Sequence, residues 1–210
     1  MRLKQLLLFA FFFLVVFNTF GQKESKTAFY FGDPIVVDSS STILIPTHYN
    51  SDFLSSNKIA LWGDFYANII FYNFISDSSK KLFKNDTFIM NFSNHYNSYR
   101  YAEDQPDNNF TLKWIFYQVK NIDHNKSGRI DNNDPSILYV SDIHGDNLKA
   151  LTTEKENVIK IELFEKQNFG LIKIQRDLDN DGDFESEDKD FYFIKLDLAD
   201  LTFGNKIETH

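Results

Sequence analysis

The stretch "ILYVSDIHGDNLKALT" at residues 137–152 decides how this chain is expected to fold. Its first part, "LYVSD", is rich in residues that favour strands, and "NLKALT" has the pattern of a second strand. The polar residues around Gly145, between the two parts, are typical of a tight turn. The stretch therefore predicts a β hairpin.

The same pattern continues along the chain. From Thr27 onward, short runs of Phe, Tyr, Ile and Val alternate with clusters of Asn, Asp, Ser and Gly, and no helix-length window keeps an apolar period of 3.6 residues. Residues 57–83, 112–151 and 169–203 each contain a strand, a connection, a second strand and a polar turn with a short return. This self-similarity predicts an all-β fold of sheets that cover one another's apolar faces. The polar stretch at 94–109 is expected to be a loop between the first two units.

The segments "LKWIFYQVKN" and "ILYVSDIHGDNLKAL" resemble the repeats of TolB-like β-propeller proteins of the bacterial envelope. The resemblance is strongest over residues 111–152. It implies antiparallel, propeller-like repeat sheets in about three blade-like units, and an envelope protein or a peptide as the partner. Closed propellers usually need at least four blades. An open stack, a partial extra unit from the strands before Asn57, and completion by assembly all remain open.

Two acidic loops of twelve residues interrupt the second and third units: "DHNKSGRIDNND" at 123–134 and "DLDNDGDFESED" at 177–188. Each has oxygen-bearing side chains at positions 1, 3, 5, 9 and 12, Gly at position 6 and an apolar residue at position 8. This is the layout of an EF-hand calcium loop, because Ca²⁺ needs roughly six to eight oxygen ligands. Asp at position 12 resembles the dockerin variant, although here strands follow the loops. Position 7 contributes a backbone carbonyl. The predicted ligands are Asp123, Asn125, Ser127, Arg129, Asp131 and Asp134 for one ion, and Asp177, Asp179, Asp181, Asp183, Glu185 and Asp188 for the other.

The two loops are expected to bind two Ca²⁺ ions that stabilise the fold. An exported protein meets abundant calcium, and the flanking strands provide no helix pair that a sensor opens. The alternative for each loop is a solvated, Asp- and Asn-rich hairpin turn. Because the loops occupy equivalent places, Ile137, Tyr139, Phe191 and Phe193 are expected to face the same layer of adjacent sheets.

The N-terminus has the pattern of a secretory signal peptide. Arg2 and Lys4 precede an apolar run at residues 6–17, which is shorter than the ~20 residues that span a membrane. We expect residues 1–21 to be removed and residues 22–210 to form one periplasmic or extracellular domain without a membrane span. The chain has 0 Cys, so disulfides cannot stabilise that exported domain.

The net charge argues against nucleic acid as a partner. Of 22 basic and 30 acidic residues, two basic ones lie in the predicted signal peptide, which leaves 20 against 30 and a net charge of −10. Phosphate backbones bind basic surfaces, so cations are the expected counterpart of this domain.

Catalytic motifs are incomplete in this sequence. "SDIHGD" at 141–146 resembles the first metal-binding motif of calcineurin-like metallophosphoesterases, but the companion "GNH" and "GHxH" segments are missing. The sequence has no thiol, no "GxSxG" and no "HExxH", and its five histidines are scattered. We therefore expect a non-catalytic binding or structural module, with a calcium-dependent envelope hydrolase as the alternative. Trp62, Trp114 and the tyrosines at 96–101 are a weaker hypothesis for a carbohydrate platform.

Overall fold

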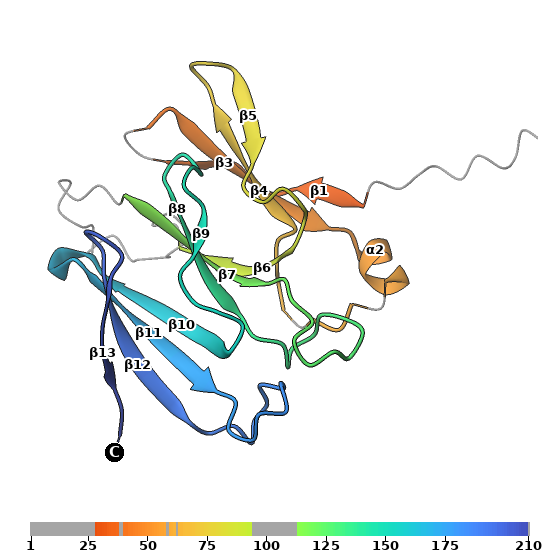
Figure 1. Cartoon of the computed structure of the whole chain (residues 1–210). Helices are drawn as coiled ribbons and strands as arrows, with labels where there is room; N and C mark the ends of the chain where they lie inside the picture. The colour runs from red at the N-terminus through yellow and green to blue at the C-terminus, as the bar shows by residue number, and fades with distance from the viewer. Residues whose placement is uncertain (1–27, 38–39, 58, 62, 94–112, 210) are drawn as a thin grey trace, which may run out of the picture.

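The computed structural model describes residues 28–37, 40–57, 59–61, 63–93 and 113–209. Within these ranges the chain is all-β, and three antiparallel sheets follow one another along the sequence (Figure 1). The predicted signal peptide, the stretch at 94–109, Trp62 and the tyrosines at 96–101 lie outside the described residues. None of the helices in the described ranges is long and apolar enough to cross a membrane.

Each sheet is a meander of neighbouring strands. The first contains β1 (Phe29–Phe31), β2 (Ile35–Val36), β3 (Thr42–Tyr49), β4 (Asn68–Asn73) and β5 (Ser78–Lys81), with β1 and β2 both pairing with β3. The second contains β6 (Phe88–Phe92), β7 (Trp114–Lys120), β8 (Ile137–Asp142) and β9 (Lys149–Ala150). The third contains β10 (Glu156–Phe164), β11 (Phe169–Arg176), β12 (Phe191–Asp197) and β13 (Phe203–Ile207). Within the described ranges, the helical elements are α2 (Ser51–Ser56) and the 3₁₀ turn η2 (Glu165–Gln167).

The second sheet packs against both of the others. On one of its faces, Ile115, Tyr117 and Val119 join Leu44 and Phe71 of the first sheet in one apolar cluster. The side chains that alternate with them point to the opposite face and join a second cluster with the third sheet. Both faces of the middle sheet are therefore buried, which explains why β7 is a nearly continuous apolar run.

The second and third sheets meet through equivalent faces. Leu138 lies four residues beyond the first acidic loop and Tyr192 four residues beyond the second, and both belong to the cluster between these sheets. The alternate residues point away: Tyr139 packs towards the first sheet, whereas Phe193 is 39% exposed. The expectation that Tyr139 and Phe193 face the same layer is therefore wrong. If every sheet in the stack faced the same way, side chains at equivalent positions of two neighbouring sheets would not meet. Here the second and third sheets face each other, so that the equivalent residues Leu138 and Tyr192 lie in the same cluster.

The first sheet differs most from its prediction. The unit at 57–83 was expected to begin with a strand, but its described residues before β4 belong to a connection between β3 and β4 that also contains α2. Isolated bridges join this connection to the second unit, at Ala60 with Asp131 and at Tyr66 with Ile89. Asn50 begins α2 by accepting a hydrogen bond from the Phe53 amide. Local capping and contacts with the next unit thus replace the expected strand.

We expect the interface between the second and third sheets to contribute strongly to stability. Ile172 is fully buried in its cluster, so Ile172→Ala should reduce the free energy of unfolding by about 2–5 kcal/mol. The exposed Ile75→Ala is the control and should change it by less than about 0.5 kcal/mol. Chemical denaturation measures both, and equal losses would contradict this account of the core.

Candidate metal centre

The two acidic loops lie at the same end of the second and third sheets. The first, residues 123–134, joins β7 to β8, and the second, residues 177–188, joins β11 to β12. Figure 1 shows them as the green and blue loops at the lower right. The Phe184 amide of the second loop donates to the Asn133 carbonyl of the first at 2.8 Å, so the loops are in direct contact.

The backbones of the two loops share an unusual conformation. Position 4 has positive φ in both loops, 60° at Lys126 and 60° at Asn180. Position 6 also has positive φ, 91° at Gly128 and 90° at Gly182. Lys is rarely found in this left-handed region, so its presence there shows that the surrounding hydrogen bonds define the loop.

The carboxylate at position 1 organises each turn. Asp123 accepts hydrogen bonds from the amides of Ser127 and Gly128, both at 2.9 Å. Asp177 accepts from Asn180 at 2.7 Å and from Gly182 at 2.9 Å. In both loops the position-6 glycine therefore donates to the first aspartate, and the loop wraps around that carboxylate.

The carboxylate at position 12 closes each loop. Asp134 accepts from the amides of His124 at 2.7 Å and Asp131 at 2.8 Å. Asp188 accepts from the corresponding amides, at positions 2 and 9, at 2.9 and 3.3 Å. Asp134 is 0% exposed and Asp188 is 5% exposed. Carboxylates buried to this degree need strong compensation, and amide donors supply part of it.

A polar side chain at the end of the preceding strand fixes each loop to its sheet. The buried Lys120 ammonium donates to the carbonyls of Asn132, at 3.0 Å, and Asp134. Burial lowers the pKa of Lys120 to about 8, although Asp134 and Asp131 act in the opposite direction. In the third sheet, Gln175 donates to carbonyls at positions 9 and 12 of the second loop, at 2.8 and 3.0 Å. Neither residue was predicted from the sequence. The feature that could have identified both is a polar side chain near the end of an otherwise apolar strand.

The second loop brings together three of its predicted ligands. Carboxylate oxygens of Asp177, Asp179 and Asp188 lie within 4.8 Å of one another, which makes this trio a candidate cation site. Partial desolvation, followed by the like charges of Asp181 and Asp188, raises the pKa of Asp179. The Asp179 carboxylate therefore lies beside negative charge that the chain itself does not fully balance.

The remaining predicted ligands of the second loop are placed differently. The Asp181 carboxylate accepts from the Asp183 amide at 2.8 Å, and the Asp183 carboxylate accepts from Asn125 of the other loop. Glu185 is exposed, and its pKa is raised mainly by Glu187. Asp181 and Glu185 do not belong to the trio described above.

The first loop has fewer charges but brings oxygens together in two places. The side chains of Asp123 and Asn125 both accept from the Ser127 amide, each at 2.9 Å. The Ser127 hydroxyl donates to the Arg129 carbonyl at 3.0 Å, so two further predicted ligand oxygens are adjacent. Asp131 forms an ion pair with Arg129, at 3.5 Å. In the part of the chain that the structure describes, this loop holds no trio of carboxylates as close as that of the second loop.

The "SDIHGD" motif is a turn. The Asp142 carboxylate accepts from the amides of His144 at 2.9 Å and Asp146 at 2.8 Å. The His144 ring points elsewhere and hydrogen-bonds the Thr42 hydroxyl at 2.8 Å, which joins the turn to the first sheet. Asp142 and His144 therefore do not converge on a common point as metal ligands require.

Trp114 belongs to the core and not to a carbohydrate platform. It packs against the cluster between the second and third sheets, and its indole N–H donates to the Leu198 carbonyl at 2.8 Å. Trp114 therefore has the core position that is usual for an aromatic side chain on a strand, because the interface provides both an apolar environment and a hydrogen-bond partner.

We expect Gly145 in the turn to be sensitive to substitution for two reasons. Its φ is +74°, and an added Cβ would lie 2.7 Å from the Phe71 ring of the first sheet. Gly63 is a matched control, because its φ is +93° but no atom lies within 4 Å of an added Cβ. Gly63→Ala should therefore cost only the backbone strain, about 1 kcal/mol, and Gly145→Ala about 1–3 kcal/mol more. If thermal unfolding gives equal losses, the turn does not pack against the first sheet as described.

No family model matches this sequence, and no curated protein is significantly similar to it. The chemistry of the two loops is therefore inferred from their own geometry.

Proposed function

We propose that this protein is an exported calcium-binding β-sheet protein, with one Ca²⁺ in each acidic loop, that acts as a non-catalytic binding or structural module. The observation that carries the proposal is the equivalence of the two loops. The two loops begin 54 residues apart (177 minus 123), and each has positive φ at positions 4 and 6. In each loop the first aspartate accepts from the glycine amide at position 6, and the last aspartate accepts from the amide at position 9. Two unrelated surface turns would not be expected to share all of these features.

The donor atoms favour Ca²⁺ over softer metals. The ligand positions offer carboxylate, amide, hydroxyl and backbone oxygens, and none offers sulfur or imidazole. Hard oxygen donors in a flexible loop suit Ca²⁺. Asp177, Asp179 and Asp188 are the residues most ready to hold the ion in the second loop, because their oxygens are already close together.

A stabilising role is favoured over a sensing role. Strands enter and leave both loops, and Lys120 and Gln175 attach the loops to those strands. Binding of an ion would therefore hold β7 against β8 and β11 against β12. In a chain with 0 Cys, two such ions would provide the crosslinks that disulfides provide in other exported domains.

The arrangement of the sheets also bears on the propeller-like proposal. Three antiparallel meanders in chain order support the resemblance to propeller repeats. The facing positions of Leu138 and Tyr192 favour an open, layered stack over a ring of blades, since blades related by rotation keep equivalent faces on the same side. We propose an open stack that presents its outer faces to an envelope protein, a peptide or a carbohydrate.

The test is thermal unfolding of residues 22–210 in excess Ca²⁺ and in chelator. Calcium at a hundredfold excess over Kd should add roughly 2.7 kcal/mol per site. Each kcal/mol raises the melting temperature of a domain of this size by about 2–4 °C. Identical melting temperatures under the two conditions would remove the calcium proposal.

Variants of the first aspartates distinguish the two sites. Asp177→Ala should lose more of the calcium-induced stabilisation than Asp123→Ala, because the second loop has five carboxylate side chains at ligand positions and the first has three. Glu162→Ala is the control, since it removes one negative charge outside both loops, from an exposed ion pair with Lys160. A calcium response in Asp177→Ala as large as that of the control would contradict the assignment of the second site.

A further inference from the structure

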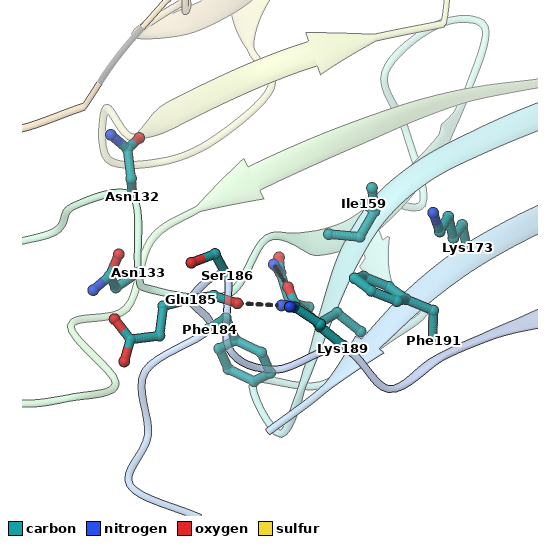
Figure 2. A pocket seen from close by; sticks show the side chains of 11 residues that line it. Asn132, Asn133, Ile159, Lys173, Phe184, Glu185, Ser186, Lys189 and Phe191 are labelled. Atoms are coloured by element: carbon teal, nitrogen blue, oxygen red, sulfur yellow. Dashed lines mark hydrogen bonds between the residues drawn. The ribbon is translucent and has the colours of Figure 1, made fainter. Parts of the chain in front are cut away.

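A hollow of about 660 Å³ lies where the second loop folds over the outer face of the third sheet. Figure 2 shows its walls: Asn133 from the first loop, Glu185 and Ser186 from the second loop, and Ile159, Lys173 and Phe191 from the sheet. Its volume is in the range of small-molecule sites in proteins. Gln175 and Asn157 also line it, but they hydrogen-bond each other at 2.9 Å and belong to the framework.

Two ammonium groups line the hollow although the chain as a whole is acidic. Lys173 and Lys189 line it, and within the described ranges neither ammonium group has a carboxylate at ion-pair distance. The Lys173 ammonium lies 4.6 Å from the centre of the Phe191 ring, which holds it over the hollow. The one lining carboxylate is Glu185, which the sequence pattern predicts as a Ca²⁺ ligand and which lies outside the trio of Asp177, Asp179 and Asp188. With that carboxylate bound to the ion, two ammonium groups remain unopposed.

The neutral walls suit a ligand that is polar but not uniformly charged. The Asn133 side chain offers an amide donor and acceptor, Ser186 offers a hydroxyl, and Ile159 and Phe191 offer apolar surface. Sugars combine hydroxyl groups with apolar ring faces, and a sugar carboxylate would supply the charge that the two lysines need. An acidic peptide would match the charge as well, but peptide recognition usually uses a strand edge or an extended groove, and this hollow lies on a sheet face.

We propose that this hollow binds a carboxylated saccharide. The proposal rests on the proposed function in one respect: residues 184–186 and Lys189 belong to the second loop or follow it directly, so one wall depends on the calcium-bound loop. Binding should therefore be stronger in calcium, and by linkage the saccharide should raise the calcium affinity of the second loop by the same factor.

The experiment is titration calorimetry of residues 22–210 with trigalacturonate in excess Ca²⁺, with maltotriose as the uncharged probe. We expect binding of trigalacturonate and at least roughly tenfold weaker binding of maltotriose. The double variant Lys173→Gln, Lys189→Gln should bind trigalacturonate roughly tenfold more weakly or not at all. Lys195→Gln is the matched control; its ammonium lies over Phe169 on the same sheet, and Lys195 is not among the residues of the hollow. It should bind like the unmodified protein.

Three outcomes would overturn the inference: no binding of trigalacturonate, equal binding by the double and control variants, or tighter binding of a pentaglutamate peptide than of the saccharide. Melting of every variant in calcium and in chelator separates this inference from the proposed function. Calcium stabilisation without saccharide binding removes only the saccharide site. A different result is equal saccharide binding in calcium and in chelator, together with no stabilisation by calcium. That result would support the saccharide site formed by the two lysines, and it would contradict both the calcium proposal and the linkage between the two ligands.

Discussion

The buried carboxylates of Asp134 and Asp188 are the constraint on which the rest of the molecule depends. A charged group at such low exposure is stable only if donors or a cation surround it, so the loop must fold back until its amides reach the carboxylate. This requirement fixes the conformation of each loop and, through Lys120 and Gln175, the separation of the strands that the loop joins. The hairpins β7–β8 and β11–β12 are therefore defined by electrostatics at one end and by apolar packing along their length.

The contact between the loops extends this constraint from single hairpins to the stack. Phe184 donates to Asn133, and the Asn125 amide donates to the Asp183 carboxylate, so each loop completes the polar environment of the other. Gly182 is favoured here by its φ of +90° and not by space, because an added Cβ would lie at an ordinary contact distance of 3.5 Å from the Asn125 Cα. The bridge between Ala60 and Asp131 adds the first unit to the same end of the molecule. All three units are therefore in contact at this end of the molecule.

Much of the fold could be predicted from the sequence, because strand periodicity and turn residues are local signals. The β8–β9 hairpin, the three-fold repetition and the predominance of strands are confirmed. The strands β5 and β13 were expected only as short returns after a polar turn, because "SSKK" is polar and "FGNKI" is exposed along its whole length, so both form through pairing with a neighbour. Which sides of the second and third sheets face each other could not be predicted either, because that depends on tertiary packing. For the candidate site, spacing alone predicted twelve ligand positions, of which Asp177, Asp179 and Asp188 lie close together. Lys120, Gln175 and the contact between the loops involve partners that the ligand spacing does not specify.

The hydrogen bond from Trp114 to Leu198 has a consequence for how the stack comes apart. It lies at the opposite end of β7 and β12 from the acidic loops, and it forms between a core indole and a backbone carbonyl without any ionisable group. If the loops bind Ca²⁺ as proposed, one end of the interface depends on the ion, and the other end is held by a contact that the ion does not affect. Loss of the proposed Ca²⁺ would release the strands at the loop end and leave them held at the indole, so that amide protons near the loops would exchange with solvent well before those beside Trp114.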